Sequence, residues 1–310
     1  MCKVCASRPS KTISNYDCKF DQTACRQRYR HSWYRSRIVL KMSETTVTLP
    51  RLLDAASTQL RVIGALVLRE TMTRYGEHKI GFLWAFIEPM LLVLVVSAIF
   101  TGMGTHIPGG MPLATFMITG FVPYTIFRDT MQQLQGAISQ NSSLMAFPQV
   151  TTFDVVVARA LLELAVLMCV LGIMLLGAGL LGNDIRVEDP LKVFAACGLL
   201  SVLGLGMGFV FAALSPILPS SRQLVNQVLG RPLFLASGLF YTAETLPTWL
   251  REWLLYNPLL HLIELVRSAY FVQFESQYGS WSYATVCSFS VLAFGLLVHQ
   301  ALRRRAIVGL

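Results

Sequence analysis

The feature that most constrains this chain is a set of four long stretches without Asp, Glu, Lys or Arg. They are Pro89–Phe127, Leu164–Asn183, Val193–Ser221 and Ser276–Leu302. A helix needs about 20 mostly apolar residues to cross the hydrocarbon core of a bilayer, and each stretch reaches that length. Charged residues make up only 14% of the chain, against about 25% in an ordinary soluble domain. The sequence therefore predicts an integral membrane protein and argues against a soluble enzyme.

These stretches predict an all-α integral membrane fold with six transmembrane helices. Gly102-Met-Gly104 and Pro108-Gly-Gly110 divide the first stretch into two helices. Between Arg231 and Trp281 the apolar residues are irregular, and the charge-free part at 232–243 is too short to cross alone. We expect a broken or re-entrant fifth element there. The other five spans are expected at about 82–102, 112–131, 160–182, 192–214 and 282–302.

The net charge of +9 belongs almost entirely to residues 1–41, which hold ten Lys or Arg and two acidic residues. The rest of the chain holds 16 basic and 15 acidic side chains, so no nucleic-acid partner is indicated. A zinc site on the leader cysteines is disfavoured by their spacing, and no apolar stretch there suits a secretory signal. We expect 1–41 to be disordered or untranslated, with Met42 as the initiator in the second case. We expect 42–80 to form a cytosolic tail and interface helix, and 81–310 to form the six-span domain. The leader cysteines are Cys2, Cys5, Cys18 and Cys25.

The distribution of Lys and Arg predicts that both termini are cytosolic. With the N-terminus inside, 12 of the 16 basic residues after position 41 fall in cytosolic segments, as the positive-inside rule favours. Before the first span, Leu52–Thr73 has apolar residues at helical spacing, but four charged residues interrupt them. We expect an amphipathic helix there, lying in the cytosolic interface or packed under the bundle.

No motif for catalysis is present. The sequence contains no GxxxxGK[ST] loop, no HExxH and no GxSxG, so we predict no catalytic residue, metal or cofactor on this chain. Gly204, Gly206 and Gly208 lie inside an apolar stretch without a preceding strand, and their spacing indicates close helix packing. A transporter, a non-transporting scaffold and a polyprenol-linked glycosyltransferase remain the classes to separate.

Ionisable residues inside the expected spans are the sharper candidates. Glu88, beside Pro89, is either a pore-facing or hinge-side carboxylate paired with an Arg, or a carboxylate just below the interface. Arg159 and Glu163 lie four residues apart, which suits an ion pair within one helix. Glu264 and Arg267, three residues apart, are most simply another such pair.

The expected cytosolic loop at 132–152 carries apolar residues and has no charge before Asp154. Exposing such a segment to water is unfavourable. We therefore expect lipid headgroups or a partner protein to cover it.

Aromatic residues gather late in the chain, where positions 234–283 hold twelve of them. They suit an aromatic belt at the outer membrane interface. Alternatively, some of them line an exit path for an amphiphile. The four that we single out are Tyr241, Trp249, Trp253 and Tyr256.

Several motifs together resemble the membrane subunit of type-2 ABC exporters, and more narrowly the permeases of capsular polysaccharide export. The resemblance covers about residues 55–305. The motifs are Leu68-Arg69-Glu70, Thr73-Arg74-Tyr75, Gly81-Phe-Leu-Trp84-Ala-Phe-Ile-Glu88-Pro89, Asn141-x-x-Leu144-x-x-Phe147-Pro148-Gln149-Val150, and Asn257-Pro258-Leu-Leu-His261-x-x-Glu264-x-x-Arg267-Ser268.

This resemblance implies a homodimeric permease in the inner membrane of a Gram-negative bacterium. Two copies of a separate ATPase subunit would carry ATP and Mg²⁺, and periplasmic and outer-membrane export proteins would complete the route. The cargo would be a lipid-linked capsular polysaccharide or, as the alternative, another lipid-linked glycan such as O-antigen or teichoic acid. ATPase coupling is expected at Arg69, Glu70, Arg74, Asn141, Leu144, Phe147 and Gln149, and the translocation path or hinge at Glu88, Pro89, Arg159 and Glu163.

Overall fold

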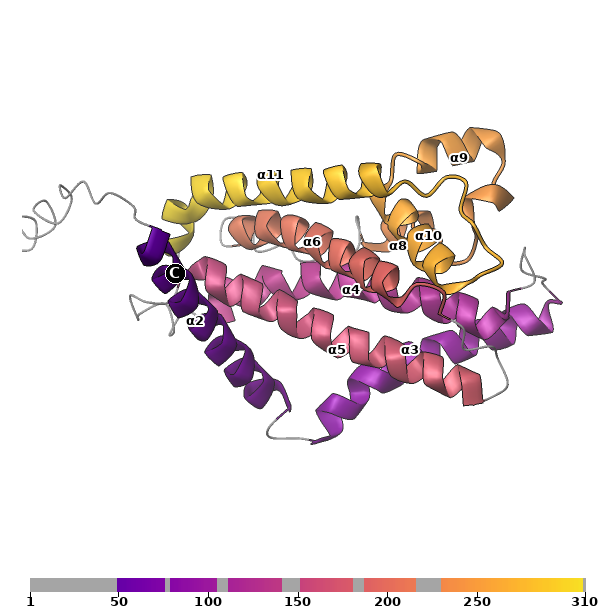
Figure 1. Cartoon of the computed structure of the whole chain (residues 1–310), viewed down its shortest axis with the longest axis horizontal. Coiled ribbons are helices and arrows are strands. Elements are labelled where there is room, and N and C mark those ends of the chain that lie inside the picture. The colour runs from indigo at the N-terminus through magenta and orange to yellow at the C-terminus, as the bar shows by residue number, and fades with distance from the viewer. Residues whose placement is uncertain are drawn as a thin grey trace, which may run out of the picture. The chain divides into compact units, whose positions relative to one another are not determined.

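The computed structural model of the chain describes residues 49–75, 79–104, 111–140, 151–180, 187–215 and 230–308, and all regular structure in these ranges is helical. The helical bundle belongs to a unit of residues 56–310. Its long helices are α2 (Leu49–Tyr75), α3 (Lys79–Gly102), α4 (Leu113–Gln140), α5 (Thr152–Leu180), α6 (Pro190–Leu214) and α11 (Trp281–Val308) (Figure 1). Between α6 and α11 lie the short elements α8 (Arg231–Ala236), η4 (Ala243–Thr245), α9 (Thr248–Leu254) and α10 (Pro258–Tyr270).

Most of the expected helices form close to their expected positions. The interface helix corresponds to α2, and the predicted spans at 82–102, 160–182, 192–214 and 282–302 correspond to α3, α5, α6 and α11. The fifth element is broken, as expected, into α8, η4, α9 and α10. The leader at 1–41, its cysteines and Met42 lie outside the described residues.

The second predicted helix ends too early. We expected it to end near residue 131, but α4 continues to Gln140. The expectation followed the end of the apolar stretch, whereas Met and Gln after Asp129 are good helix formers and carry the helix onward. Arg128 and Asp129 therefore lie well inside α4 and not near its end.

By length and hydropathy, three helices within the described ranges can cross a bilayer: α5, α6 and the part of α11 at Trp281–Leu302. The apolar part of α3, Phe86–Gly102, is shorter. The charged and polar residues of α4 lower its hydropathy, yet α4 is buried without interruption from Thr115 to Phe127. Other helices surround α4, so it needs no apolar surface of its own toward lipid.

One face of α6 packs against α4 through two glycines. A Cβ atom on Gly204 would lie 2.8 Å from the carbonyl oxygen of Phe127, and one on Gly208 would lie 2.6 Å from the Leu134 side chain. Residues four apart share a helix face, so both glycines allow α4 to approach α6 closely. The interpretation of these glycines as packing residues is confirmed.

The opposite face of α6 packs against α11 in the same way. A Cβ on Gly206 would lie 2.6 Å from the backbone nitrogen of Leu292, and a Cβ on Gly295 would overlap the backbone of Gly206. Small residues allow helix backbones to approach closely in a membrane, where lipid is as apolar as a leucine side chain. These contacts make α6 the centre of the bundle.

The same contacts show that α6 and α11 run in one direction (Figure 1). Gly206 meets Leu292, and further along both helices the Phe209 ring lies 5.4 Å from the His299 ring. The end of α6 and the start of α11 therefore lie at opposite ends of the bundle. The chain between them has to pass from one end to the other.

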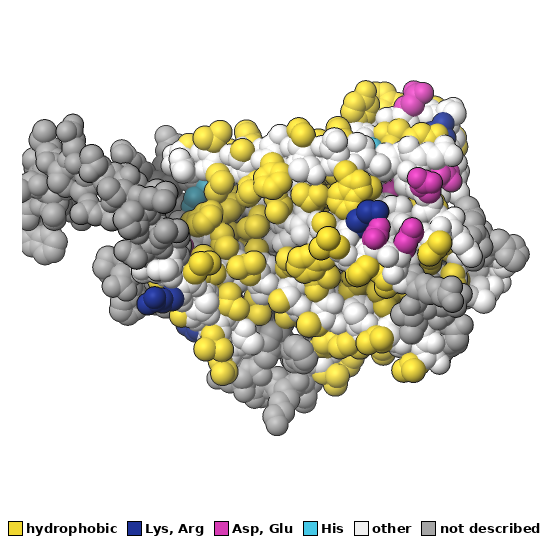
Figure 2. All heavy atoms as spheres, in the orientation of Figure 1, with side chains coloured by type: hydrophobic (Ala, Val, Ile, Leu, Met, Phe, Trp, Pro, Cys, Tyr) yellow, Lys and Arg dark blue, Asp and Glu magenta, His cyan; other side chains and the backbone are white. Residues whose placement is uncertain are grey.

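Apolar side chains cover much of the bundle surface, as Figure 2 shows for one face. Such a surface is far larger than the apolar patches that soluble proteins expose, and it suits contact with lipid. Exposed examples from α3, α5 and α11 are Leu91, Leu94, Ile99, Leu161, Ile173, Leu176, Val286, Phe294 and Leu297.

We predict that Gly206→Ala destabilises the bundle by about 1–3 kcal/mol, as overpacking of a close contact usually does. The added methyl group meets backbone atoms of α11, which cannot rotate away. Thermal unfolding of the purified protein measures the loss. Gly198→Ala is the matched control on α6, because no atom lies within 4 Å of its added Cβ. Equal melting temperatures for the two variants would contradict the packing role.

Candidate functional site

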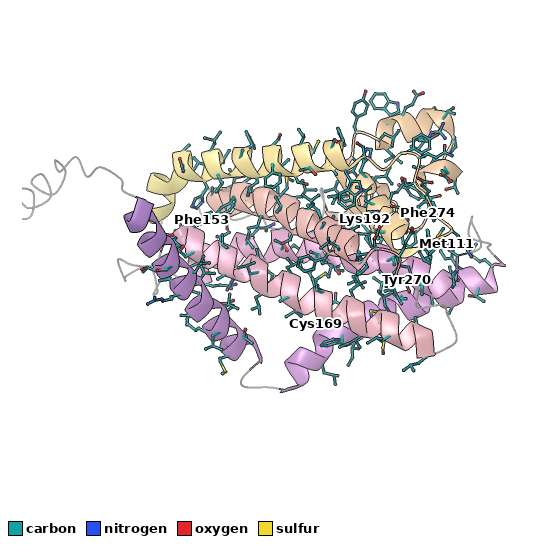
Figure 3. The ribbon with its side chains drawn as sticks, in the orientation of Figure 1. Met111, Phe153, Cys169, Lys192, Tyr270 and Phe274 are labelled. Atoms are coloured by element: carbon teal, nitrogen blue, oxygen red, sulfur yellow. The ribbon has the colours of Figure 1, made fainter. Side chains whose placement is uncertain are left out.

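Buried polar groups occur where helices of the bundle meet. In Figure 3, Phe153 marks the end of the bundle where α5 begins, and Lys192 marks the end where α6 begins. Three groups of charged side chains connect segments that are distant in sequence. We name them the junction cluster (Gln59, Glu70, Asp154 and Arg159), the α3–α4 ion pair (Glu88 and Arg128) and the α10 pair (Glu264 and Arg267).

Asp154 caps the N-terminus of α5 and connects this helix to α2. Its carboxylate accepts hydrogen bonds from the backbone and hydroxyl groups of Thr151, at 2.9 and 2.7 Å, while the Thr151 hydroxyl accepts the Asp154 N–H at 3.3 Å. This reciprocal arrangement is a capping box. The Gln59 side-chain amide of α2 donates to the same carboxylate, so one buried acid both starts α5 and holds α2.

Arg159 joins three helices. Its guanidinium lies 2.8 Å from the Glu70 carboxylate of α2, and the two side chains are only 6% and 14% exposed. It also donates to the Gln133 carbonyl at 3.1 Å and to the Gln140 side chain at 2.7 Å, both on α4. Removing one partner of a buried ion pair is costly because the other charge stays in a low-dielectric environment. The junction cluster therefore fastens α2 to α4 and α5.

The predicted pairing of Arg159 with Glu163 stays a prediction, although Glu163 is also buried. Among the other expected coupling residues, Arg69 lies on the exposed part of α2. The Arg74 side chain is outside the described part of the structure. So is the segment 141–150, which holds Asn141, Leu144, Phe147 and Gln149.

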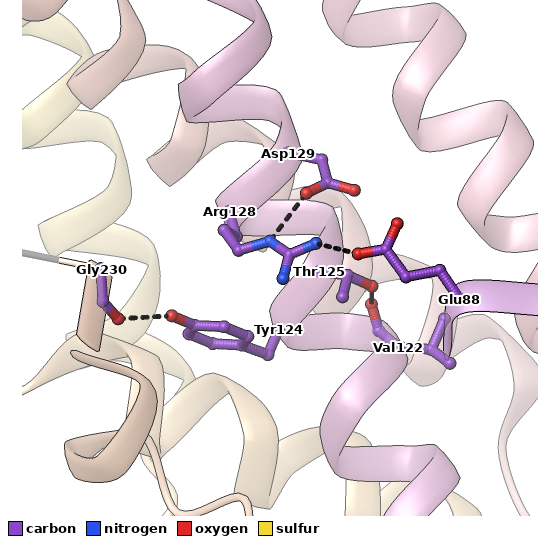
Figure 4. Close-up of polar contacts among 7 residues, drawn as sticks. All are labelled: Glu88, Val122, Tyr124, Thr125, Arg128, Asp129 and Gly230. Atoms are coloured by element: carbon purple, nitrogen blue, oxygen red, sulfur yellow. Dashed lines mark hydrogen bonds and ion pairs between the residues drawn. The ribbon is translucent and has the colours of Figure 1, made fainter. Parts of the chain in front are cut away.

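Glu88 has an arginine beside it (Figure 4). Its carboxylate lies 3.5 Å from Nη2 of Arg128 on α4, and Nε of Arg128 donates to Asp129 at 2.8 Å. The Glu88 side chain is 59% exposed, and Pro89 follows it inside α3. An arginine partner for Glu88 was expected under one of its two interpretations, and this contact agrees with that one. Its place on a translocation path stays a prediction.

Arg267 of α10 holds the turn that follows α8. Its guanidinium donates to the carbonyl oxygens of Gly238, Leu239 and Tyr241 at 2.7, 2.8 and 3.0 Å. It lies 3.7 Å from the centre of the Phe116 ring of α4, and its side chain is completely buried. Gly238 has φ +77°, a conformation that glycine adopts without strain. Arg267 therefore fixes the shape of this turn.

Glu264 holds the next part of the same segment. Its carboxylate accepts the backbone N–H of Ala243 at 2.5 Å, and it also accepts the hydroxyl of Ser276. The expected Glu264–Arg267 pair therefore stays a prediction, and each side chain has further partners outside α10. Both side chains bind the segment 238–243, because its unpaired backbone groups lie within their reach and need partners when buried.

The expected exit-side aromatics lie on the surface. Trp249 and Trp253 of α9 are 66% and 75% exposed, and Tyr256 just after it is 76% exposed. The Tyr241 hydroxyl donates to the Leu235 carbonyl at 2.8 Å, across the turn that Arg267 holds. The exposed rings suit either a membrane interface or an exit path, and their role stays a prediction.

Two of the central residues, Arg128 and Arg267, were not singled out from the sequence for the roles they have here. Arg128 directly follows an apolar stretch and was counted only among the basic residues on the cytosolic side. Arg267 was given only a local helical partner. The available signal in both cases was a charge within or beside a long apolar helix, where charges are expensive and usually have partners.

The three groups bind other parts of the chain and form joints between helices. They can transmit movement between segments or resist it. Within the described ranges, no set of three His, Cys, Asp or Glu side chains is placed to hold a metal ion.

Residues 61–271 match the family model of the ABC-2 type transporter membrane domain. The chain belongs to that family. The matched range includes α3 to α10, with Glu70, Arg159 and both charged pairs. The all-helical structure of the described residues is consistent with that family.

The chain is similar to three characterised export proteins. It is 29% identical to the polysialic acid transport protein KpsM of Escherichia coli, over 77% of this chain and 92% of that protein. It is 30% identical to the capsule polysaccharide export inner-membrane protein CtrC of Neisseria meningitidis serogroup A, over 79% and 92%. A shorter match, 37% identical over 31% of this chain and 37% of the other, joins it to the O-antigen export system permease protein RfbA of Myxococcus xanthus.

We predict that Arg267→Lys destabilises the bundle by about 1–3 kcal/mol, the cost of leaving a buried polar group unsatisfied. Lysine keeps the charge, but its ammonium group cannot reach three carbonyl oxygens as the planar guanidinium does. Thermal unfolding measures the change. Arg251→Lys is the matched control, because Arg251 is partly exposed and its guanidinium lies 4.7 Å from the centre of the Tyr278 ring without binding buried carbonyl oxygens of the described residues.

We also predict that Glu70 and Arg159 are energetically coupled. Each single reversal, Glu70→Arg or Arg159→Glu, should lower the melting temperature, and the double reversal should recover about 1–3 kcal/mol of the summed loss. As a control, the double variant Asp189→Lys with Lys192→Asp should change the melting temperature little, because these side chains are 43% and 60% exposed. Additive losses at Glu70 and Arg159 would contradict the coupling.

Proposed function

We propose that this chain is the permease subunit of an ATP-driven exporter that moves a lipid-linked capsular polysaccharide across the inner membrane. A separate ATPase subunit, in two copies, would supply the energy, and two permease chains would form the channel. Periplasmic and outer-membrane export proteins would carry the polymer onward. The family match and the similarity to the capsule export proteins support this proposal.

The observation that carries the proposal is the junction cluster. An exporter without a nucleotide site of its own needs a mechanical connection from its cytosolic surface to its membrane helices. The Glu70 carboxylate and the Arg159 guanidinium lie 2.8 Å apart and are nearly buried. This ion pair resists movement of α2 relative to α5. Movement imposed on α2 by an ATPase would reach α5 and, through Gln133 and Gln140, α4.

The proposed topology has six membrane elements with both termini in the cytosol. Because α6 and α11 run in the same direction, one further crossing between them is needed, which supports a fifth element in the region of α8 to α10. That region would form the outer part of the path, with the α10 pair holding its turn. The exposed rings of α9 would then face the outer interface.

The alternative cargo is another lipid-linked glycan. The match to the O-antigen permease favours it over a scaffold or a glycosyltransferase, but it covers a smaller part of both chains. No described contact reads the identity of a sugar. The cargo therefore has to be identified from cells.

Deleting the gene tests the proposal. We expect surface capsular polysaccharide to disappear while the polymer accumulates inside the cell, and a plasmid copy should restore the surface signal. Antibody labelling of whole cells, with extraction of the intracellular glycan, measures both pools. A normal capsule together with a lost O-antigen ladder would favour the alternative cargo, and an unchanged surface would overturn export.

Arg69 and Arg74 would attract the acidic lipid-linked terminus to the cytosolic mouth. The charge reversal Arg69→Glu with Arg74→Glu should reduce surface polysaccharide severalfold without preventing membrane insertion, because the attraction depends on charge near the membrane surface. Immunoblots of the membrane fraction control for insertion. Unchanged export would leave these arginines only the role of orienting the protein.

A further inference from the structure

A cavity of about 380 Å³ lies between α4 and the start of α8. Its size falls within the usual range for small-molecule sites. The lining includes two arginines and no carboxylate, and it combines polar groups with an aromatic wall. The lining residues are Tyr124, Arg128, Gln132, Gly230, Arg231, Phe234 and Leu235.

The guanidinium of Arg128 is only partly used by its protein partners. Nε donates to Asp129 and Nη2 lies beside Glu88, whereas no described residue accepts a hydrogen bond from Nη1 (Figure 4). Neither Asp129 nor Glu88 lines the cavity. The two carboxylates therefore hold the guanidinium in place from outside and offset its charge. Arg128 offers N–H donors to the cavity, and Arg231 adds a positive charge to the lining.

Tyr124, one turn before Arg128 on α4, adds an aromatic surface to the cavity. Its hydroxyl donates to the Gly230 carbonyl at 3.0 Å, which joins α4 to the residue before α8 (Figure 4). Its ring packs at 5.4 Å from the Phe234 ring. Aromatic walls of this kind present flat apolar faces, and a sugar ring has C–H faces that suit them.

The cavity lies beside the middle of α4 and not at either end of that helix. At about 1.5 Å per residue, Arg128 lies about 22 Å from the start of α4 and about 18 Å from its end, given the helix bounds Leu113–Gln140. In the span expected at 112–131, Arg128 lies toward the cytosolic side, where arginines that orient a membrane protein also occur. A charged residue inside a membrane helix can also belong to a ligand or ion pathway.

We propose that this cavity binds an oxyanion of the transported glycolipid, with Arg128 and Arg231 as its cationic contacts. The inference rests on the proposed export function and adds a recognition site to it. A guanidinium binds carboxylate and phosphate oxygens through paired N–H groups, so two sources fit. One is the carboxylate of an acidic sugar, and the other is the phosphodiester that joins the glycan to its lipid.

Binding to the full-length chain in phosphatidylcholine nanodiscs, without nucleotide, tests the site. The probes are tetrameric sialic acid for the carboxylate, glycerophosphoglycerol for the phosphodiester, and maltotetraose as the neutral comparison. Thermophoresis gives the Kd of each. We expect one acidic probe or both to bind more tightly than maltotetraose, and the probe that binds identifies the source.

Two variants change the lining without touching the α3–α4 ion pair. Arg231→Gln removes one charge, and Gln132→Glu places a carboxylate in the cavity at nearly constant size. Each should raise the Kd of the acidic probe about tenfold, the effect of losing one charged hydrogen bond. Gln133→Glu is the matched control, because it adds the same charge one residue along α4, on an exposed side chain outside the lining.

The site is overturned if neither acidic probe binds better than maltotetraose, or if Gln133→Glu weakens binding as much as Gln132→Glu does. Size-exclusion elution of each variant establishes that it is folded. The outcome is independent of the deletion experiment, since binding is measured without transport. Suppose that the deletion strain loses its capsule while Arg231→Gln and Gln132→Glu leave the Kd of the acidic probes unchanged. The proposed binding site would then be wrong, and the proposed export function would still hold.

Discussion

The architecture depends on the close approach of α6 to its two neighbours. Helices in lipid gain little from burying apolar side chains against one another, so backbone proximity and dense packing have to supply the association energy. Gly204 and Gly208 provide it toward α4, and Gly206 provides it toward α11. α10 also packs on α6 and α4. The segment that α10 holds is therefore built on this central contact.

Charges serve a different purpose from glycines in this bundle. The glycine contacts form a continuous centre, whereas the buried charges lie where a peripheral segment meets that centre. Glu70 and Arg159 attach α2, and Glu264 and Arg267 attach the turn after α8. Buried charges cost desolvation free energy, so their use at these joints trades stability for attachment in one defined geometry.

The sequence predicted the helices well and the joints poorly. Charge-free stretches mark apolar helices directly, and glycine spacing within one helix shows which face is small. The end of α4 was misplaced because a helix can outlast its apolar stretch. The partner of Arg159 on α2 and the partners of Arg267 at 238–241 lie far away in sequence. Spacing within a helix can suggest only partners one turn away, such as Glu163 or Glu264, so only the folded chain reveals these contacts.

The hydrogen bonds of Arg267 end on carbonyl oxygens, and every residue type carries one. Exchanging the side chain at Phe240 or Tyr241 removes none of these three bonds, and only Gly238, with its positive φ, is bound to its residue type. The turn can therefore acquire a new chemical surface while keeping its shape.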